Sequence, residues 1–317
     1  MAVISDFSFT ERTEAERGLK AVFHAKIVPL LKDRETEQIR RRRNLFVGGG
    51  GVAVFGLLAG GLVTVSAGLP KGIAVGIVCL LVASMIAVYQ QTKWRNRLGE
   101  QILPILAEFL GDMTYGQNQI EIQEFAQRGI LPDHAKADFD DAMVGAHKGL
   151  KWALAEATLA TKRGSRGGQR TVFRGLLLKI EIFGPAPRIL MLPSSGAAAD
   201  WMSELFSSTR KKAHRFETGI AAFDAQIISY AEDPDEARAY IDKRFADGLL
   251  ELGKSVSSKP VRAAMEGSWL YLAIPQSRNL LSLGSLWKPV QEIEEELHHV
   301  IEELTLPRRV IEILSGR

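Results

Sequence analysis

Carboxylates inside predicted strands are the first residues in this sequence that could carry out chemistry. Glu156, Glu181 and Asp224 lie in stretches with a strand-like pattern. Carboxylates that share a pocket could act as a general acid and a general base if their pKa values were shifted. Scattered carboxylates on alternating strands are usually solvent-facing residues. We therefore assign no catalytic residue and keep an enzyme with a carboxylate site as an alternative hypothesis.

The histidines and the cysteine show no pattern of a metal or nucleophile site. His298 and His299 are adjacent in a predicted helix, so their side chains point about 100° apart and cannot easily share a metal ion. His147 and His214 are isolated in predicted loops, and the single cysteine, Cys79, cannot form a disulfide within one chain. The sequence also lacks HExxH and GxSxG motifs. The stretch "GLLELGKS" (248–255) has the spacing GxxxxGK[ST], but it lies at the end of a predicted helix, whereas a phosphate-binding loop joins a strand to a helix. We expect no metal and no cofactor, and these residues give no nucleophile.

Two basic clusters are the remaining candidates for binding. Beside an anionic membrane surface, such residues are worth about 1 kcal/mol each, although ordinary solvated loops can have the same composition. Neither cluster has interleaved aromatic residues for base stacking, and the net charge is only +3, so we expect no nucleic-acid partner. The candidate lipid-headgroup contacts are Arg163, Arg166 and Arg170 in one cluster and Lys211 and Lys212 in the other.

The elements that would position these residues begin with two apolar runs. Residues 45–67 and 72–89 contain no charged side chain and are joined by residues 68–71. At about 1.5 Å per helical residue, both runs come near the ~30 Å hydrocarbon core of a bilayer. A signal peptide would lie closer to the N-terminus, and a core hairpin would show a polar face. The sequence therefore predicts a transmembrane helical hairpin.

The basic residues that flank the two runs predict how the hairpin is oriented. Arg40 to Arg43 precede the first run and Lys93, Arg95 and Arg97 follow the second, whereas the connector holds only Lys71. Cytoplasmic ends of membrane helices carry the excess of lysine and arginine. We therefore expect a multi-pass protein with both termini in the cytoplasm.

Glycines in both runs have the spacing of a helix-packing face. Gly56 and Gly60 are four residues apart in the first run, and Gly72 and Gly76 repeat that spacing in the second. Glycines at this spacing let helix backbones approach closely, either within the hairpin or in an oligomer. Glycine is also common in membrane helices in general. Neither run has an Asp, Glu, Lys, Arg or His residue that would mark an ion path, so a pore is not expected.

The segments outside the hairpin predict an α+β protein. Residues 1–43 form an amphipathic helical arm that Pro29 kinks or splits, and residues 93–317 form a mainly antiparallel β domain with flanking helices. The hairpin between them occupies residues 44–92. Strands are expected at 118–124, on both sides of Lys148-Gly149, and at 171–183, 187–193 and 221–231, with a hairpin over 260–275 that turns near Glu266-Gly267. Helices are expected from Asp233 to Leu252 and from Pro289 to Leu304, with Pro307 as a break.

At this point the layout resembles the bacterial family of domains of unknown function 3137. The stretches that carry the resemblance are "DDAMVGAHKG" (140–149), "LAEATLATK" (154–162), "TVFRGLLLKIEI" (171–182), "AQIISYAEDPDEARAYI" (225–241) and "SWLYLAIP" (268–275). The chain departs from the usual pattern at 239–242, where the family tends to have a Leu-Thr-Pro type turn. The resemblance implies a bacterial origin, the topology described above and no particular reaction, and it suggests a LemA-type membrane protein as a partner.

These observations predict a membrane-tethered binding or scaffolding module in the bacterial inner membrane that contacts anionic lipid headgroups. Two alternatives stay open. The first alternative is an enzyme at the cytoplasmic membrane face, and the second is a subunit of a larger inner-membrane complex. The expected partners are the lipid bilayer and another membrane protein or a second copy of the chain.

Overall fold

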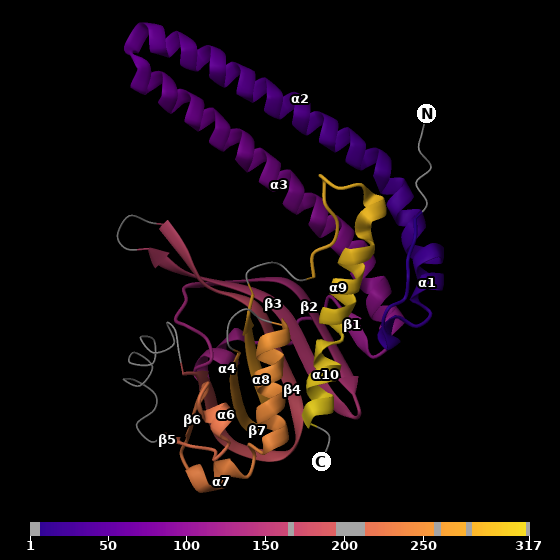
Figure 1. Ribbon diagram of the computed structural model, residues 1–317, viewed down its shortest axis with the longest axis vertical. Helices are drawn as coiled ribbons and strands as arrows, with labels where there is room; N and C mark the ends of the chain where they lie inside the picture. Colours follow the sequence, from indigo (N-terminus) through magenta and orange to yellow (C-terminus); the bar gives the residue numbers. More distant parts are fainter. Residues whose placement is uncertain (1–6, 164–167, 195–212, 257–260, 277–280, 315–317) are drawn as a thin grey trace. The chain divides into compact units, whose positions relative to one another are not determined.

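The computed structural model describes residues 7–163, 168–194, 213–256, 261–276 and 281–314 (Figure 1). The chain divides into two compact units, each assembled from segments that are distant in the sequence. The first unit comprises Met1–Phe109 and Ser282–Ile301, and the second comprises Leu110–Leu281 and Glu302–Arg317. Each unit is described by itself below.

Two long helices dominate the first unit. They follow a 3-10 turn and two short helical segments, and Pro29 lies in the first turn of α2, directly after the π-helical segment. The helix runs on from Leu19 through Pro29, so Pro29 does not split it, and the irregularity there is the π-helical segment. Gly68, with a φ of +92°, is the only residue between the long helices (Figure 1). The segments are η1 (Glu14–Glu16), α1 (Leu19–Val22), the π-helical η2 (Phe23–Ile27), α2 (Val28–Ala67) and α3 (Leu69–Leu110).

The core of the first unit lies at the ends of the long helices that are far from Gly68. Helix η4 (Val290–Ile293) and helix α9 (Glu294–Leu304) lie beside the N-terminal arm there. The ring of Phe9 stacks on His298 with centroids 4.9 Å apart, and it also contacts Phe23. Buried side chains of this core include Leu19, Phe23, Ile27, Leu31, Trp94, Leu98, Ile102 and Leu297.

The second unit is built on an antiparallel sheet, which confirms the predicted α+β class. Among the residues that the structure describes, the sheet has seven strands in the order β1-β2-β3-β4-β6-β5, with β7 also paired to β4. The strands are β1 (Met113–Tyr115), β2 (Lys136–His147), β3 (Leu150–Arg163), β4 (Gly168–Pro193), β5 (His214–Phe216), β6 (Ile227–Ala231) and β7 (Arg262–Pro275). The predicted turn at Lys148-Gly149 is present, because both residues have positive φ.

Strand β4 is the centre of this sheet and corrects two predictions. It runs unbroken over the two strands predicted at 171–183 and 187–193, pairing first with β3 and then with β6. Strand β7 pairs along β4 from Gly175 to Met191, so the predicted hairpin near Glu266-Gly267 is wrong. The glycine instead takes a φ of +59° at an irregularity in the pairing. Both halves of β7 remain on the same neighbouring strand, and no reversal of the chain is needed.

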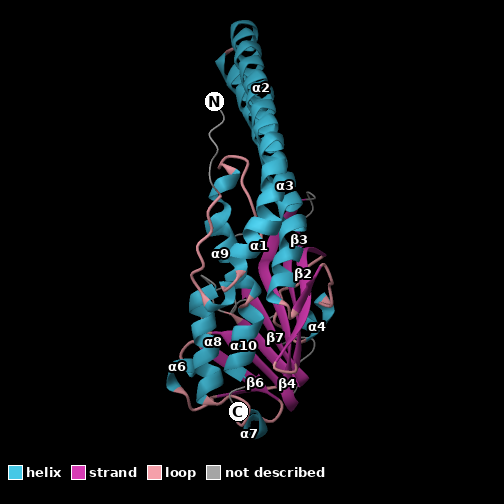
Figure 2. Ribbon diagram, turned by 90° about the vertical axis from the view of Figure 1, so that its right-hand side faces the viewer, coloured by secondary structure: helices cyan, strands magenta, loops and turns pink. Residues whose placement is uncertain are grey.

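Helices cover both faces of the sheet (Figure 2). On one face, Phe125 of α4 packs in a core with Ala153, Ala155 and Ala157 of β3. On the other face, α8 and α10 lie over Leu270 and Leu272 of β7. Side chains alternate between the faces of a strand, which explains how one sheet supplies two cores. The helices are α4 (Ile122–Gln127), α6 (Ala221–Asp224), α7 (Pro234–Arg238), α8 (Lys243–Val256) and α10 (Leu306–Leu314).

Several helix boundaries differ from the sequence prediction. Residues 118–124 were expected to be a strand, but α4 begins at Ile122, because Phe125 becomes buried against the sheet. The predicted strand at 221–231 is helix α6 followed by β6. Asp233 caps α7 as predicted, accepting hydrogen bonds from the backbone N–H groups of residues 235 and 236, but α7 and α8 are separate helices. Pro307 lies in the first turn of α10, where proline is well tolerated.

Candidate functional site

The three carboxylates considered for catalysis have separate sets of partners. Glu156 of β3 is buried, 1% exposed, with Oε1 3.9 Å from the guanidinium of Arg174. Glu181 of β4 accepts a hydrogen bond from the backbone N–H of Lys151. Asp224 accepts hydrogen bonds from the backbone and hydroxyl of Thr218 and from the next backbone N–H, so it holds a turn. These contacts do not bring the three carboxylates into one pocket.

The histidines lie in ion-pair networks or on the surface. His147 ends β2, and its ring nitrogens are 3.7 Å from Asp112 Oδ2 and 3.5 Å from Glu312 Oε1. His298 is buried and its Nδ1 is 2.7 Å from Glu16 Oε1. His214 and His299 are exposed. Within the described part of the chain, no group of three or more His, Cys, Asp or Glu residues is placed to hold a metal ion.

The predicted lipid-headgroup residues fall largely on parts of the chain that the structure does not describe. Arg170 is exposed near the start of β4, where it pairs with Thr161 of β3. Arg163 ends β3, and its side chain lies outside the described residues, as do Arg166, Lys211 and Lys212 altogether. The contact of these residues with lipid stays a prediction.

The four glycines considered for helix packing have different surroundings. A Cβ atom on Gly56 would lie 2.7 Å from Cys79 Cβ and 3.2 Å from its Sγ, so α2 and α3 approach closely at this point. Gly60 is also buried. A Cβ on Gly76 would meet no atom within 4 Å. The surroundings of Gly72 are outside the described residues.

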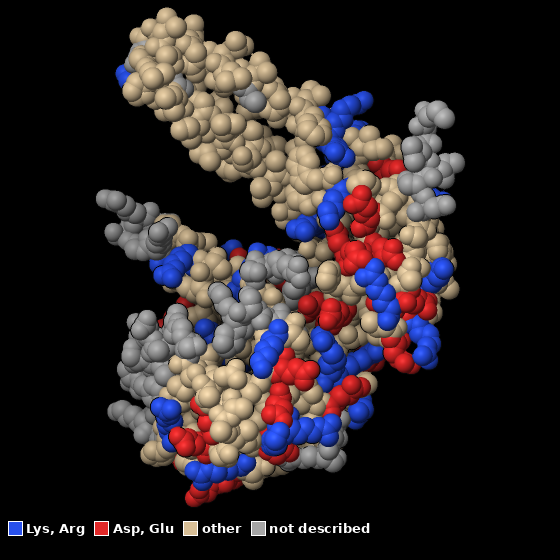
Figure 3. All heavy atoms as spheres, viewed as in Figure 1, with Lys and Arg blue, Asp and Glu red and all other residues tan. Residues whose placement is uncertain are grey.

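The outer part of the hairpin carries a large exposed apolar surface. Among the described residues, every large apolar side chain that is exposed lies between Ile39 and Tyr89, apart from Phe183 and Trp287. Figure 3 shows this region almost free of charged atoms, with lysine and arginine gathered at its base. Examples of the exposed side chains are Phe55, Leu57, Leu62, Val65, Leu80 and Met85, which are between 61% and 90% exposed.

Glu37 joins the two long helices at the base of the hairpin. Its carboxylate accepts hydrogen bonds from Arg34 and Arg41 of α2 and from Arg97 of α3, at 2.6 to 3.0 Å. Burial alone would raise the pKa of Glu37, but the hydrogen bonds from Arg34 and Arg41 outweigh it and lower the pKa. Arg41 and Arg97 thus neutralise a half-buried carboxylate, whereas Arg40, Arg42, Arg43 and Lys93 are exposed.

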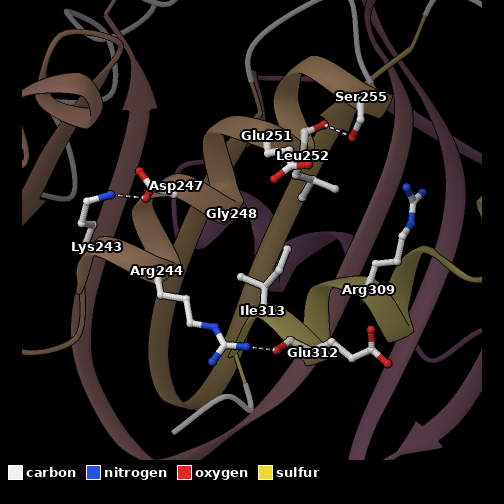
Figure 4. Close-up of a pocket in the computed structure, with 10 residues that line it drawn as sticks. All are labelled: Lys243, Arg244, Asp247, Gly248, Glu251, Leu252, Ser255, Arg309, Glu312 and Ile313. Carbon is white, nitrogen blue, oxygen red and sulfur yellow. Dashed lines mark hydrogen bonds and ion pairs between the residues drawn. The ribbon is translucent and has the colours of Figure 1, made fainter.

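A groove between α8 and α10 in the second unit was not foreseen from the sequence. It has a volume of about 700 Å³, and Gly248, Leu252 and Ile313 are among its lining residues (Figure 4). A Cβ atom on Gly248 would lie 2.3 Å from Ile313 Cγ2, so the helices can meet only because this residue is glycine. The glycine in a strongly amphipathic helix was the available sequence signal.

The charges around this groove are balanced. Lys243 pairs with Asp247 at 2.7 Å, and Arg244 donates a hydrogen bond to the backbone oxygen of Glu312 (Figure 4). The other charged residues in the lining are Glu251 and Arg309. Three basic and three acidic side chains therefore line the groove, and its net charge does not select a cation or an anion.

A cluster of aromatic and basic side chains lies on the opposite face of the sheet. The guanidinium of Arg128 lies 4.0 Å from the ring centroid of Tyr271, and Lys179 Nζ lies 4.6 Å from the ring of Trp269. Lys179 also pairs with Glu124 of α4 at 2.7 Å. Burial raises the pKa of Tyr271 to about 12, so its hydroxyl stays protonated at neutral pH. The cluster ties α4 to the sheet and is not arranged for proton transfer.

Together, the fold and these surfaces define an α+β protein with two helices that are long and apolar enough to cross a membrane, judged by length and composition over the described residues. Residues 171–315 match the model of the family "Protein of unknown function (DUF3137)", which confirms the predicted family for this part of the chain.

Two further comparisons give no information on the function of this chain. The chain is similar to the solved structure described as "crystal structure of the mycobacterial trehalose monomycolate transport factor A, TtfA", with 13% sequence identity and a TM-score of 0.31. That similarity covers 70% of this chain and 93% of the other, and a TM-score this low supports no conclusion about function. The comparison with curated proteins found no match.

Proposed function

We propose that this protein is a membrane-tethered binding or scaffolding module, anchored in a bacterial inner membrane by α2 and α3. One observation carries the proposal: the large apolar side chains between Ile39 and Tyr89 are exposed along most of the hairpin. Burying a large apolar side chain is worth about 1.5 to 3 kcal/mol, so an uncovered surface of this extent requires an apolar environment. A bilayer supplies that environment, and the helices satisfy their own backbone hydrogen bonds within it.

The distribution of basic residues supports the proposed orientation. Exposed Arg40, Arg42, Arg43 and Lys93 lie at the base of the hairpin, whereas Lys71 is the only charged residue near its tip. The excess of basic residues marks the cytoplasmic side. Both ends of the chain and the sheet unit are then cytoplasmic. The candidate carboxylates of the sheet unit already make structural contacts, so a binding role fits this unit better than a catalytic one.

Cysteine labelling of the full chain tests this proposal. In a Cys79→Ala background, single cysteines replace Lys71 at the tip, Leu57 in the middle of the apolar run of α2 and Glu251 on the exposed side of α8. We expect a membrane-impermeant maleimide to label position 71 in intact spheroplasts and position 251 only after permeabilisation. Position 57 should stay unlabelled in both states.

Two outcomes would contradict the proposal. Labelling of positions 71 and 251 from the same side would show that the hairpin does not cross the membrane. Release of the protein from membranes by alkaline carbonate would show that it is not integral. A matched variant with no cysteine, Cys79→Ala alone, measures the background labelling.

A further inference from the structure

The loop before α9 presents a tryptophan beside the beginning of the apolar surface. Trp287 is 45% exposed. Among the described residues, Trp287 and Phe183 are the two large apolar side chains that are exposed outside residues 39–89. The rings of Trp287 and Phe46 contact each other edge to face, with centroids 6.1 Å apart. Phe46 is the second residue of the predicted first span. Trp287 thus extends the apolar surface of the hairpin from a distant part of the sequence.

This loop is held against the hairpin by hydrogen bonds. Gln38 of α2 is 6% exposed, and its Nε2 donates to the backbone oxygens of Ser285 and Lys288 at 2.6 and 2.7 Å. The backbone N–H of Leu286 donates to Gln91 Oε1 of α3 at 2.9 Å. Both long helices therefore hold the loop, with Gln38 bound on both sides of Trp287 in the sequence and Gln91 bound just before it.

Gly284 allows the loop to approach α3 closely. A Cβ atom there would lie 2.3 Å from Leu98 Cδ1, and its φ is +82°. Its backbone oxygen accepts a hydrogen bond from Arg95 Nε at 3.3 Å, and its N–H donates to the Glu296 carboxylate. These contacts fix the position of the loop and therefore of the exposed side chain of Trp287.

Basic side chains also lie beside the aromatic rings at the base of the hairpin. Arg42 lies with its guanidinium carbon 5.9 Å from the Phe46 ring centroid, and Lys93 lies at the same distance from the ring of Tyr89. Lys288 is exposed next to Trp287. Tryptophan beside lysine and arginine, at the end of an apolar span, is the composition of a membrane interface: the ring prefers the headgroup layer and the cations attract lipid phosphates.

We propose that residues 284–288 form a third membrane contact, in which Trp287 enters the headgroup layer of an anionic bilayer beside the first turns of the span in α2. Lys288, Arg42 and Arg43 bind lipid phosphates around it. The contact rests on the proposed membrane anchoring and adds a segment nearly 200 residues beyond the hairpin, as the residue numbers show. Because η4 and α9 follow the loop directly, it also keeps that part of the first unit at the bilayer surface.

Spin-label accessibility in nanodiscs of mixed anionic and neutral lipid tests this contact with the full chain. Each variant carries Cys79→Ala and one labelled cysteine, at Lys288, at Leu57 in the span, or at Glu14, an exposed residue of the arm. We expect the label at 288 to be less accessible to a water-soluble nickel chelate than the label at 14, and more accessible than the label at 57. The substitution Trp287→Ser should raise the accessibility at 288, whereas the control Trp269→Ser in the sheet unit should leave it unchanged.

The outcomes separate the contact from the anchoring. If the label at 57 is shielded and the label at 288 is as accessible as the one at 14, the membrane contact is refuted while the anchoring stands. If the label at 57 is accessible, the anchoring fails and the contact fails with it. Neutral lipid alone should increase the accessibility at 288, and no response to lipid charge would refute the role of Arg42 and Arg43.

Discussion

At the scale of single residues, the most constrained ionisable group of the first unit is Glu16. It is 2% exposed and accepts hydrogen bonds from the backbone N–H groups of Arg12 and Thr13, while His298 lies 2.7 Å away. Burial by itself would raise the pKa of Glu16, but the hydrogen bonds from Arg12, His298 and Thr13 outweigh that cost and lower it. The carboxylate thus ties the N-terminal arm to α9 in its ionised form.

The lowered pKa of Glu16 predicts a loss of stability in acid. A carboxyl whose pKa is lower in the folded state than in the unfolded state stabilises the fold above its unfolded pKa of 4.5, and this contribution is lost as the pH falls through the lower folded value. We expect Glu16→Gln to lower the stability of the arm by about 1 to 3 kcal/mol at pH 7 and to flatten its dependence on pH below 5.

Protease susceptibility of the arm, measured between pH 3 and 7 with an acid-tolerant protease, checks this expectation. Glu14→Gln is the matched control, because Glu14 is two residues away and its side chain is 82% exposed. An unchanged pH dependence in Glu16→Gln would show that this carboxyl does not control the arm.

At the scale of elements, the contact between α8 and α10 depends on a single small residue. Gly248 faces Ile313, and the two helices together cover Leu270 and Leu272 of β7. A side chain at 248 would push α10 outward and change the groove of Figure 4. The helices of the hairpin show a similar dependence at Gly56, where Cys79 occupies the space of a Cβ.

The substitutions Gly248→Ala and Gly253→Ala should therefore have opposite effects, although both add the same methyl group to α8. We expect Gly248→Ala to destabilise the sheet unit by about 1 to 3 kcal/mol through overpacking. Gly253→Ala should be neutral or stabilising by up to about 1 kcal/mol, because a Cβ there would be 3.8 Å from its nearest neighbour and alanine favours helix.

Thermal unfolding of the full chain in detergent measures both effects. Ile313→Ala should recover part of the loss in the Gly248→Ala background, since it removes the atoms that the new methyl group meets. Equal changes in Tm for the two alanine variants would refute the overpacking at 248.

At the scale of the whole molecule, the last 36 residues of the chain are shared between the two units. Residues 282–301 complete the first unit, whereas residues 302–317 return to the second. The arm contacts α9 through Glu294 with Thr10, Glu295 with Arg12, and His298 with Glu16. The N-terminal arm therefore depends on a segment that is synthesised nearly last.

Two truncations should separate the roles of these segments. A chain that ends at Leu281 lacks the contacts of α9, so we expect trypsin to cut the arm at Lys20 and Lys26 in proteoliposomes. A chain that ends at Leu304 keeps those contacts and should keep the arm protected, while the face of the sheet under α10 becomes uncovered. Mass spectrometry of the fragments identifies the cuts. Equal protection of the arm in both truncations would show that α9 does not stabilise it.

The elements that could be predicted from the sequence are those specified by local patterns. The charge-free runs at 45–67 and 72–89 both lie within long helices, because helix formation in such a run needs no distant partner. The turn at Lys148-Gly149 and the cap at Asp233 were also predictable, since backbone conformation and capping involve residues close in the sequence. The α+β class followed from the alternation of apolar residues.

The rest depended on contacts between residues far apart in the sequence. Residues 262–275 form one strand because both halves find the same partner, β4, and residues 122–127 form a helix because Phe125 enters the core of the sheet. The groove needs Gly248 to meet Ile313, and Trp287 reaches the hairpin because Gln38 and Gln91 hold its loop. By itself the sequence determined the apolar hairpin and the strand-rich domain after it. Only the tertiary structure decided which distant segments lie beside them, because packing and hydrogen bonding over such separations leave no periodic pattern in the chain.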